Sequence, residues 1–345
     1  MAPQTQRAWI VSRKGVPKDA LSFKTGWPVP SKLAKGEVLV KVQAVALNPI
    51  GYKLMRLLPN FIARRPIPAE YDLAGVIEDP NDSQFTKGDN VFGVIHTSTS
   101  IKMREGALQQ YARILAVYLN RRPENITFVE AAGITLAAET AWQALFRCAN
   151  FEAGQTVFIN GGSSSVGAFA IQIAKAKGAA RVVVSASSQN EEFVKSLGAD
   201  EFIDYTKQPL HEYLARNPPS PKFHIILDAV ALKDPSLFTH SPAYLAPGGT
   251  FVSTGSIQGL HPFNLVLKTA VAMFWPSWLG GVPRSYKTVM LAHDASTLEG
   301  IRQLLEDGKI KPLVDSVYEF KDVLSAYERI MTSRATGKVV VRVDS

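Results

Sequence analysis

Cysteine is nearly absent from this sequence of 345 residues, which contains a single one, Cys148. An intrachain disulfide and a multi-cysteine metal site are therefore excluded. Cys148 follows Ala144 and Leu145 in an apolar pattern, so we expect it to be a small core residue. Such sparing use of cysteine is typical of a reducing, intracellular compartment.

Long uninterrupted apolar runs are also missing. The most apolar and aromatic stretch, 260–283, is interrupted by Lys268 and Pro276, whereas a membrane-spanning helix needs about 20 apolar residues. We expect this stretch to form a pocket wall, a subunit interface or a patch that touches a membrane surface, and the sequence leaves the three open. The first 15 residues lack the apolar core of a secretory signal, so a cytoplasmic location is expected, with mitochondrial or membrane-surface association left open.

Motifs of several enzyme classes do not occur. The sequence has no G-x-S-x-G elbow of a hydrolase and no P-loop. His211-Glu212 lacks the second histidine of H-E-x-x-H, and the six histidines are isolated from one another. The net charge is +8, but the cations are spread along the chain. This distribution suits a polyanionic cofactor better than nucleic acid.

The most informative stretch that is present runs from 154 to 178. A short apolar run is followed by a turn of small residues and then by a helical pattern. Gly162-x-Ser164-x-x-Gly167 matches the dinucleotide fingerprint G-x-G-x-x-G at two of its three glycines. The turn therefore predicts a pyrophosphate site at a helix N-terminus. Its residues are Gly161, Gly162, Ser163, Ser164, Ser165, Val166 and Gly167.

Ser164 is the weak point of this fingerprint. It stands where a glycine lets the backbone approach the phosphates, so we expect its side chain to crowd them. The hydroxyls of Ser163 and Ser165 are expected to compensate in part. A strand-to-helix turn without a ligand is the alternative interpretation.

Two sequence patterns divide the chain. The pattern of residues 1–127 predicts a β domain of short strands separated by Gly, Pro and Asp turns, and the same pattern returns over 309–345. Its clearest strand covers 36–47, with Glu37 on the polar face and a turn at Asn48-Pro49. Between these parts, 128–308 predict a helix over 129–148 and then alternating strands and helices. We therefore expect an α/β protein with a doubly wound parallel sheet inserted in a β domain.

Short motifs in a fixed order carry a family resemblance. Asn48-Pro49-x-x-x-Lys53, Asp72-x-x-Gly75-x-Ile77, 161–167 and Gly337-Lys338 together resemble the zinc-free branch of the medium-chain dehydrogenase/reductase superfamily. That branch includes quinone oxidoreductases and fungal enoyl-reductase-like proteins. The resemblance implies a GroES-like substrate domain formed by 1–127 and 309–345, a Rossmann domain over 128–308, and a homodimer.

Two positions depart from the family pattern. Tyr71 stands where the zinc-dependent branch has a histidine ligand, and no cysteine lies in the first third, so no metal site is expected. Without zinc, reduction of an activated C=C bond or a quinone is favoured over alcohol oxidation. Gly51 stands where many relatives carry an aspartate, which we expect to be mainly structural.

The expected cofactor is NADPH. The second strand of the parallel sheet leads into 185–190, which has no carboxylate to bind a ribose diol. By resemblance, the 2′-phosphate is held by Ser187, Asn190 and Tyr205, although these residues also fit an ordinary loop. The resemblance further assigns Asn48 and Thr140 to the cofactor. Thr254, Gly255 and Ser256 follow the fifth strand, at the carboxyl edge of the sheet where ligands bind, so we expect them to contact the cofactor as well.

The resemblance also implies the reacting groups. Tyr52 is expected to act as proton donor or orienting hydroxyl, and Lys53 to bind a carbonyl or acyl group. The alternative is that Tyr52 packs and Lys53 is solvated. The expected function is NADPH-dependent hydride transfer to a small apolar enone, enoyl or quinone substrate. The second hypothesis is an NADPH-binding protein of little catalytic activity, acting as a redox-sensing or membrane-associated partner.

Overall fold

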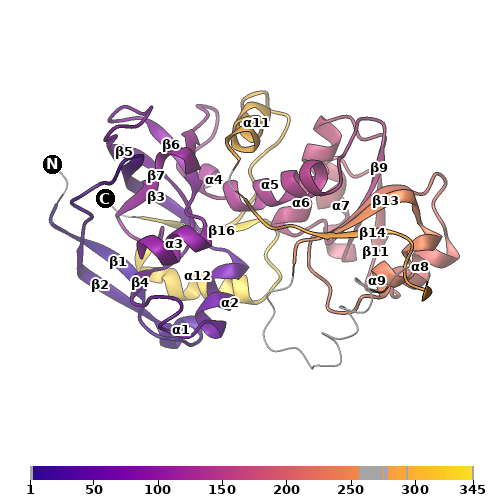
Figure 1. Cartoon of the computed structure of the whole chain (residues 1–345), viewed down its shortest axis with the longest axis horizontal. Coiled ribbons are helices and arrows are strands. Elements are labelled where there is room, and N and C mark those ends of the chain that lie inside the picture. The colour runs from indigo at the N-terminus through magenta and orange to yellow at the C-terminus, as the bar shows by residue number, and fades with distance from the viewer. Residues whose placement is uncertain (1–2, 256–274, 276–278, 293, 344–345) are drawn as a thin grey trace. The chain divides into compact units, whose positions relative to one another are not determined.

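The computed structural model describes residues 3–255, 275, 279–292 and 294–343 (Figure 1). The chain forms two compact units, the first made of 1–136 with 293–345 and the second of 137–292. The second unit therefore lies inside the range 128–308 that was expected for the inserted domain. Helix α4 (Phe128–Ala132) contacts strands of the first unit, and helix α11 (Ala295–Glu306) does so as well. Their contacts therefore group both helices with the first unit.

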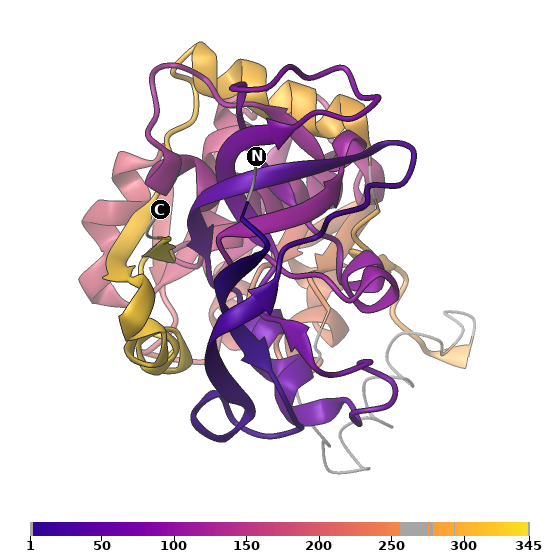
Figure 2. The same ribbon diagram turned by 90° about the vertical axis from the view of Figure 1, so that its left-hand side faces the viewer.

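The first unit contains two sheets. The larger has the order β15-β16-β3-β5-β6-β8, with β7 paired to β3, and the smaller has the order β2-β1-β4. Figure 2 shows the long antiparallel pair β1–β2 in indigo. The strands are β1 (Thr5–Val11), β2 (Leu21–Pro28), β3 (Glu37–Ala46), β4 (Ile67–Pro68), β5 (Asp72–Asp79), β6 (Asn90–Val94), β7 (Tyr111–Leu115), β8 (Leu119–Arg121), β15 (Val314–Glu319) and β16 (Lys338–Arg342).

Both ends of the chain build the larger sheet, because β16 pairs antiparallel with β3. Val38, Val40 and Val42 of β3 are buried in the core, as their alternation predicts. Glu37, expected on the polar face, is buried instead, since its carboxylate accepts the Ala34 N–H at 2.8 Å and lies 3.7 Å from Arg113.

Helices of the first unit contact one another and its core. The predicted turn at Asn48-Pro49 is instead the start of α2 (Pro49–Leu57), where proline occupies the first helical position and needs no N–H partner. Helix α12 (Val323–Met331) places Val323, Ala326 and Tyr327 in the core. The remaining helices are α1 (Pro17–Ala20), α3 (Thr97–Met103), η1 (Ala116–Tyr118) and η6 (Phe320–Asp322).

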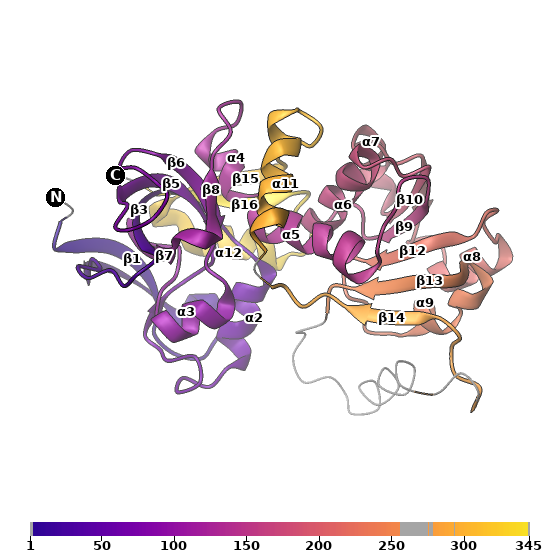
Figure 3. The ribbon, with the colours of Figure 1, turned by 45° about the horizontal axis from the view of Figure 1, so that its top comes forward.

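The second unit is a doubly wound parallel sheet, as the sequence predicted. Its order is β11-β10-β9-β12-β13-β14, and every neighbouring pair is parallel. This is the Rossmann order, with helices on both faces (Figure 3). The elements are β9 (Thr156–Asn160), α6 (Ser165–Ala176), β10 (Arg181–Ala186), η3 (Ser188–Asn190), α7 (Glu191–Ser196), β11 (Glu201–Asp204), α8 (Leu210–Arg216), β12 (Phe223–Asp228), α9 (Ser236–Thr239), η4 (Ser241–Ala243), β13 (Leu245–Ser253) and β14 (Ser285–Thr288).

The helix predicted over 129–148 is broken. Gly133 ends α4, and α5 (Thr135–Trp142) continues into a π-helical turn, η2 (Gln143–Cys148). Cys148 ends that turn and is only partly buried, so it is not the core residue that its apolar neighbours predicted. Burial nevertheless raises the pKa of its thiol.

The stretch 260–283 lies largely outside the described residues. Its expected role as pocket wall, interface or membrane patch therefore stays a prediction. Among the helices that the structure describes, none has the length and apolarity needed to cross a membrane.

Candidate functional site

Ser164 is the N-cap of α6. Its hydroxyl donates to the Gly161 carbonyl at 2.7 Å and accepts the Gly167 N–H at 3.1 Å. Serine is favoured at this position because it satisfies a backbone donor that has no partner within the helix. The side chain expected to crowd a phosphate is thus bonded to the backbone of its own turn.

The glycines of this turn are needed for packing. A Cβ at Gly162 would lie 2.0 Å from Val184 Cγ1, and a Cβ at Gly167 would lie 2.3 Å from the Gly161 carbonyl oxygen. Gly161 has φ +81°, which favours glycine. Close approach of α6 to the strands explains the glycine pattern without a ligand, and phosphate binding by the turn remains our proposal.

A polar cluster that the sequence reasoning missed joins three strand ends. Asn160 donates to Asp228 Oδ1 at 2.9 Å, and Ser185 Oγ donates to Asn160 Oδ1 at 2.7 Å. Ser185 Oγ also accepts the Gly161 N–H at 3.1 Å. Burial raises the pKa of Asp228, while the hydrogen bonds from Leu232 and Asn160 lower it. The cluster holds the start of the 161–167 turn against the sheet.

The three residues expected to hold a 2′-phosphate lie at neighbouring strand ends. Asn190 Nδ2 donates to Ser187 Oγ at 3.1 Å, and the Tyr205 N–H donates to the Ala186 carbonyl at 3.3 Å. The Tyr205 side chain is 51% exposed. Hydroxyl and amide groups of this kind suit a phosphate, so the residues present fit the cofactor that the fold implies.

Asp204 lies at the same edge, since it ends β11. Its carboxylate accepts the Thr206 hydroxyl at 2.6 Å and the Thr206 N–H at 2.9 Å, and these bonds lower its pKa. The sequence analysis looked for a cofactor carboxylate at the end of the second strand of the sheet, whereas Asp204 ends the third.

The remaining cofactor candidates of the second unit occupy two places. Thr254 donates through its N–H and its hydroxyl to the Asp228 carbonyl, at 3.1 Å and 3.3 Å, which puts it at the carboxyl edge. The Gly255 N–H donates to Ser253 Oγ at 3.3 Å. Thr140 is a half-buried residue of α5. Ser256 lies outside the described residues.

Asn48 belongs to a buried ionic network in the first unit. Lys338 Nζ donates to Asn48 Oδ1 at 2.6 Å and to Asp72 Oδ2 at 3.0 Å. Asn48 Nδ2 donates to the same Asp72 oxygen at 3.0 Å, and Asp72 Oδ1 accepts the Leu136 N–H at 2.9 Å. The side chain assigned to the cofactor is therefore engaged with two charged groups inside its own unit. The three family motifs that contain these residues meet at this point.

Tyr52 and Lys53 are half-buried neighbours on α2. The Tyr52 ring packs against the core of the first unit. Burial raises the pKa of its phenol, and the nearby Arg56 opposes that shift in part. Tyr52 therefore keeps its proton at neutral pH and can act as a hydrogen-bond donor.

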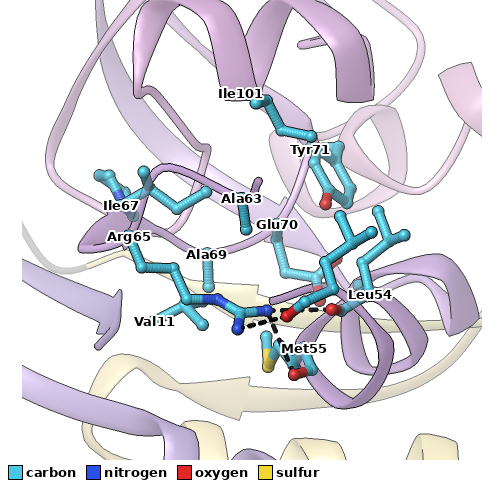
Figure 4. Close-up of a pocket in the computed structure, with 13 residues that line it drawn as sticks. Val11, Leu54, Met55, Ala63, Arg65, Ile67, Ala69, Glu70, Tyr71 and Ile101 are labelled. Carbon is cyan, nitrogen blue, oxygen red and sulfur yellow. Dashed lines mark hydrogen bonds between the residues drawn. The ribbon is translucent and has the colours of Figure 1, made fainter. Parts of the chain in front are cut away.

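A small cavity lies behind α2 (Figure 4). It measures about 30 Å³ and is lined by apolar Leu54, Met55, Ile67 and Ile101 with polar Arg65 and Glu70. That volume suits ordered water and is too small for an organic substrate. Arg65 donates to the carbonyls of Leu54, Met55 and Leu58, so it caps the C-terminal end of α2.

The residues near Tyr71 do not fit a catalytic zinc ion. Tyr71 is buried, and burial strongly raises the pKa of its phenol, which disfavours the anionic form that would bind a metal. Within the described parts of the chain, no three His, Cys, Asp or Glu side chains gather as metal ligands.

Comparisons with known proteins cover nearly the whole chain. The family profile "Alcohol dehydrogenase GroES-like domain" matches residues 34–124, and "Zinc-binding dehydrogenase" matches 197–341. A trans-enoyl reductase from Penicillium oxalicum is 32% identical, over 98% of each chain. An NADPH-dependent alkenal/one oxidoreductase from Arabidopsis thaliana is 31% identical, over 98% of this chain and 80% of the relative.

A solved structure shows the same fold. The quinone oxidoreductase from Coxiella burnetii superposes with a TM-score of 0.80 at 24% identity, covering 98% of this chain and 99% of that one.

Proposed function

This chain belongs to the medium-chain dehydrogenase/reductase superfamily, and we propose that within it the protein is an NADPH-dependent, zinc-independent reductase of an activated C=C bond or a quinone. The observation that carries this proposal is the Tyr52–Lys53 pair on α2. It offers a protonated phenol and a cation from successive residues of one helix, whereas the family's zinc branch relies on a metal.

The two side chains have separate roles. Lys53 binds the carbonyl or acyl oxygen of the substrate through its ammonium group. Tyr52 donates a hydrogen bond, and finally a proton, toward the negative charge that develops on the substrate. The network of Asn48, Asp72 and Lys338 holds the first residue before α2 and so fixes the helix that carries the pair.

Bound NADPH supplies the hydride, and the second unit binds the cofactor. We propose that Ser187, Asn190 and Tyr205 hold its 2′-phosphate and that the 161–167 turn faces its pyrophosphate. Asp204 also lies at this edge, and its carboxylate is already bonded to Thr206. The Arabidopsis relative is named for its dependence on NADPH, which supports the choice of NADPH over NADH.

The proposal is tested by mixing the protein with NADPH and a panel of alkenals, enones, enoyl thioesters and quinones, and following loss of NADPH absorbance. Turnover with at least one acceptor is expected, together with saturable NADPH binding. Saturable binding without turnover on any acceptor would favour the redox-sensing partner instead. Failure to bind NADPH at all would refute both functions.

A further inference from the structure

Glu70 is a buried residue with a strained backbone. Its φ is +63°, a left-handed conformation that residues other than glycine adopt rarely. Such conformations persist where the surrounding structure stabilises them, and they often mark functional positions. Two hydrogen bonds to the Glu70 side chain stabilise its conformation. The Tyr327 hydroxyl donates to Oε1 at 2.6 Å, and the Asn48 N–H donates to Oε2 at 3.1 Å.

The carboxylate lies against Gly51. A Cβ at Gly51 would be 2.2 Å from Glu70 Oε1 and 2.8 Å from its carboxyl carbon. Gly51 is a helical residue of α2 and its φ is not left-handed, so its backbone does not require glycine. Glycine within a helix costs about 0.5–1 kcal/mol relative to alanine. The space taken by Glu70 is therefore the reason for glycine here.

The hydrogen bond from the Asn48 N–H indicates that the Glu70 carboxyl group caps α2. Asn48 is the N-cap of α2, which makes Gly51 the third helical residue. In a capping box, the side chain of the third residue reaches back to the N–H of the N-cap. Gly51 has no side chain to do so, and Glu70 makes that bond from outside the helix.

We propose that Glu70 and Gly51 act as a pair, in which Glu70 supplies, from the segment before β5, the capping carboxyl group that Gly51 cannot provide as the third residue of α2. Glu70 is then a positioning residue, because it fixes the first turn of α2, which presents Tyr52 and Lys53. Tyr327 ties the same carboxylate to α12. The positioning role rests on the proposed function, whereas the pairing itself does not.

The experiment is a swap. Gly51→Asp, Glu70→Gly and the double variant Gly51→Asp/Glu70→Gly are compared with the parent in thermal midpoint, in kcat and KM for the best acceptor, and in NADPH affinity. Gly51→Asp should lower the thermal midpoint and kcat because its Cβ meets Glu70. Glu70→Gly should lower both because it leaves the Asn48 N–H and the Tyr327 hydroxyl without their acceptor. Each single change should lower kcat at least ~10-fold, a loss of about 1.4 kcal/mol of transition-state stabilisation.

The double variant should recover most of the lost kcat and at least half of the lost midpoint, with NADPH affinity unchanged throughout. Gly26→Asp is the matched control, since a Cβ there meets nothing within 4 Å. If Gly51→Asp does not fold while the double variant does, the pairing is supported. A double variant no better than the poorer single variant would overturn it.

Two further outcomes separate the claims. A double variant that recovers its midpoint but not its kcat would confine Glu70 to stability and overturn the positioning role. If the parent reduces no acceptor, the proposed function fails, and the midpoints still decide whether Glu70 and Gly51 are paired.

Discussion

Lys338 Nζ lies 3.0 Å from Asp72 Oδ2, and both side chains are buried, with 3% and 0% of their surface exposed. Lys338 begins the last strand of the first unit, and Asp72 begins β5. Their contact therefore fastens the C-terminal segment to the part of the sheet beside which α2 begins. Burial makes the pair sensitive to the loss of either partner.

Lys338→Met should destabilise the protein by about 3–5 kcal/mol, because it leaves Asp72 buried without its cation. Denaturant unfolding of parent and variant measures the change. Lys87→Met is the control, since Lys87 pairs with Glu78 at 2.6 Å while 62% of its side chain is exposed. The control should lose at most about 1 kcal/mol. Equal losses in the two variants would contradict the importance of the buried pair.

Tyr52→Phe should lower kcat by about 10²–10³, the usual effect of removing one donor to a developing oxyanion. Lys53→Ala should raise KM for a carbonyl acceptor as well as lower kcat. NADPH affinity should stay unchanged in both variants, as titration of cofactor fluorescence would show. Tyr318→Phe is the matched control, because Tyr318 is also partly buried against the same core. Parent-like turnover of Tyr52→Phe would remove Tyr52 from the reaction.

Ser187→Asp should weaken NADPH binding and shift preference toward NADH. A carboxylate at the end of β10 repels the 2′-phosphate and suits a ribose diol. The ratio of the two dissociation constants should change at least ~10-fold, equivalent to about 1.4 kcal/mol. Ser196→Asp, on an exposed position of α7, is the control and should leave the ratio unchanged. A parent that prefers NADH would refute the serine pocket before any variant is made.

Ser164→Ala should lower the free energy of unfolding by about 1 kcal/mol, whereas Ser164→Gly should lower it by only a few tenths. The reason is that Ser164 caps α6, and glycine is the better substitute at an N-cap. Denaturant unfolding distinguishes the two. No loss in either variant would mean that the hydroxyl contacts with Gly161 and Gly167 add little to stability. The NADPH affinity of the same two variants shows whether the serine side chain hinders binding of the phosphates, since removing a hindrance would raise that affinity.

Glu70 should make stability depend on pH. Burial raises its pKa to about 8, although the hydrogen bonds from Tyr327 and Asn48 and the charge of Lys338 lower it. The nearby Asp72 carboxylate adds to the increase. Because the folded pKa exceeds the unfolded one, the stabilisation is complete below about pH 4 and is lost as pH rises toward 8.

The free energy of unfolding should therefore fall across that window, with a slope of at most about 1.4 kcal/mol per pH unit from this group. Glu70→Gln should flatten the slope. Glu105 is a second buried carboxyl, with a pKa raised by burial to about 7. Glu105→Gln should remove only the part of the decrease in unfolding free energy that is complete near pH 7. A Glu70→Gln variant with the parent's pH profile would show that Glu70 does not titrate in this range.

The sequence by itself determined the parallel sheet and the place of its first β–α turn. Buried parallel strands read as apolar runs, and helices alternate with them at regular spacing, so local pattern is enough. The family resemblance brought Tyr205, Ser187 and Asn190 together before the structure did, and the carboxyl ends of neighbouring parallel strands share one edge. The short motifs likewise indicated the family, and relatives at about 30% identity support it.

Only the tertiary structure decided how the first unit is held together. Asn48, Asp72 and Lys338 come from distant segments, and no local period indicates that their side chains meet. The same holds for Glu70, whose left-handed backbone and contact with Gly51 depend on the packing of β5, α2 and α12. Periodicity specifies which face of an element is buried. It does not specify which polar groups satisfy one another inside, because that depends on side-chain geometry across elements far apart in the chain.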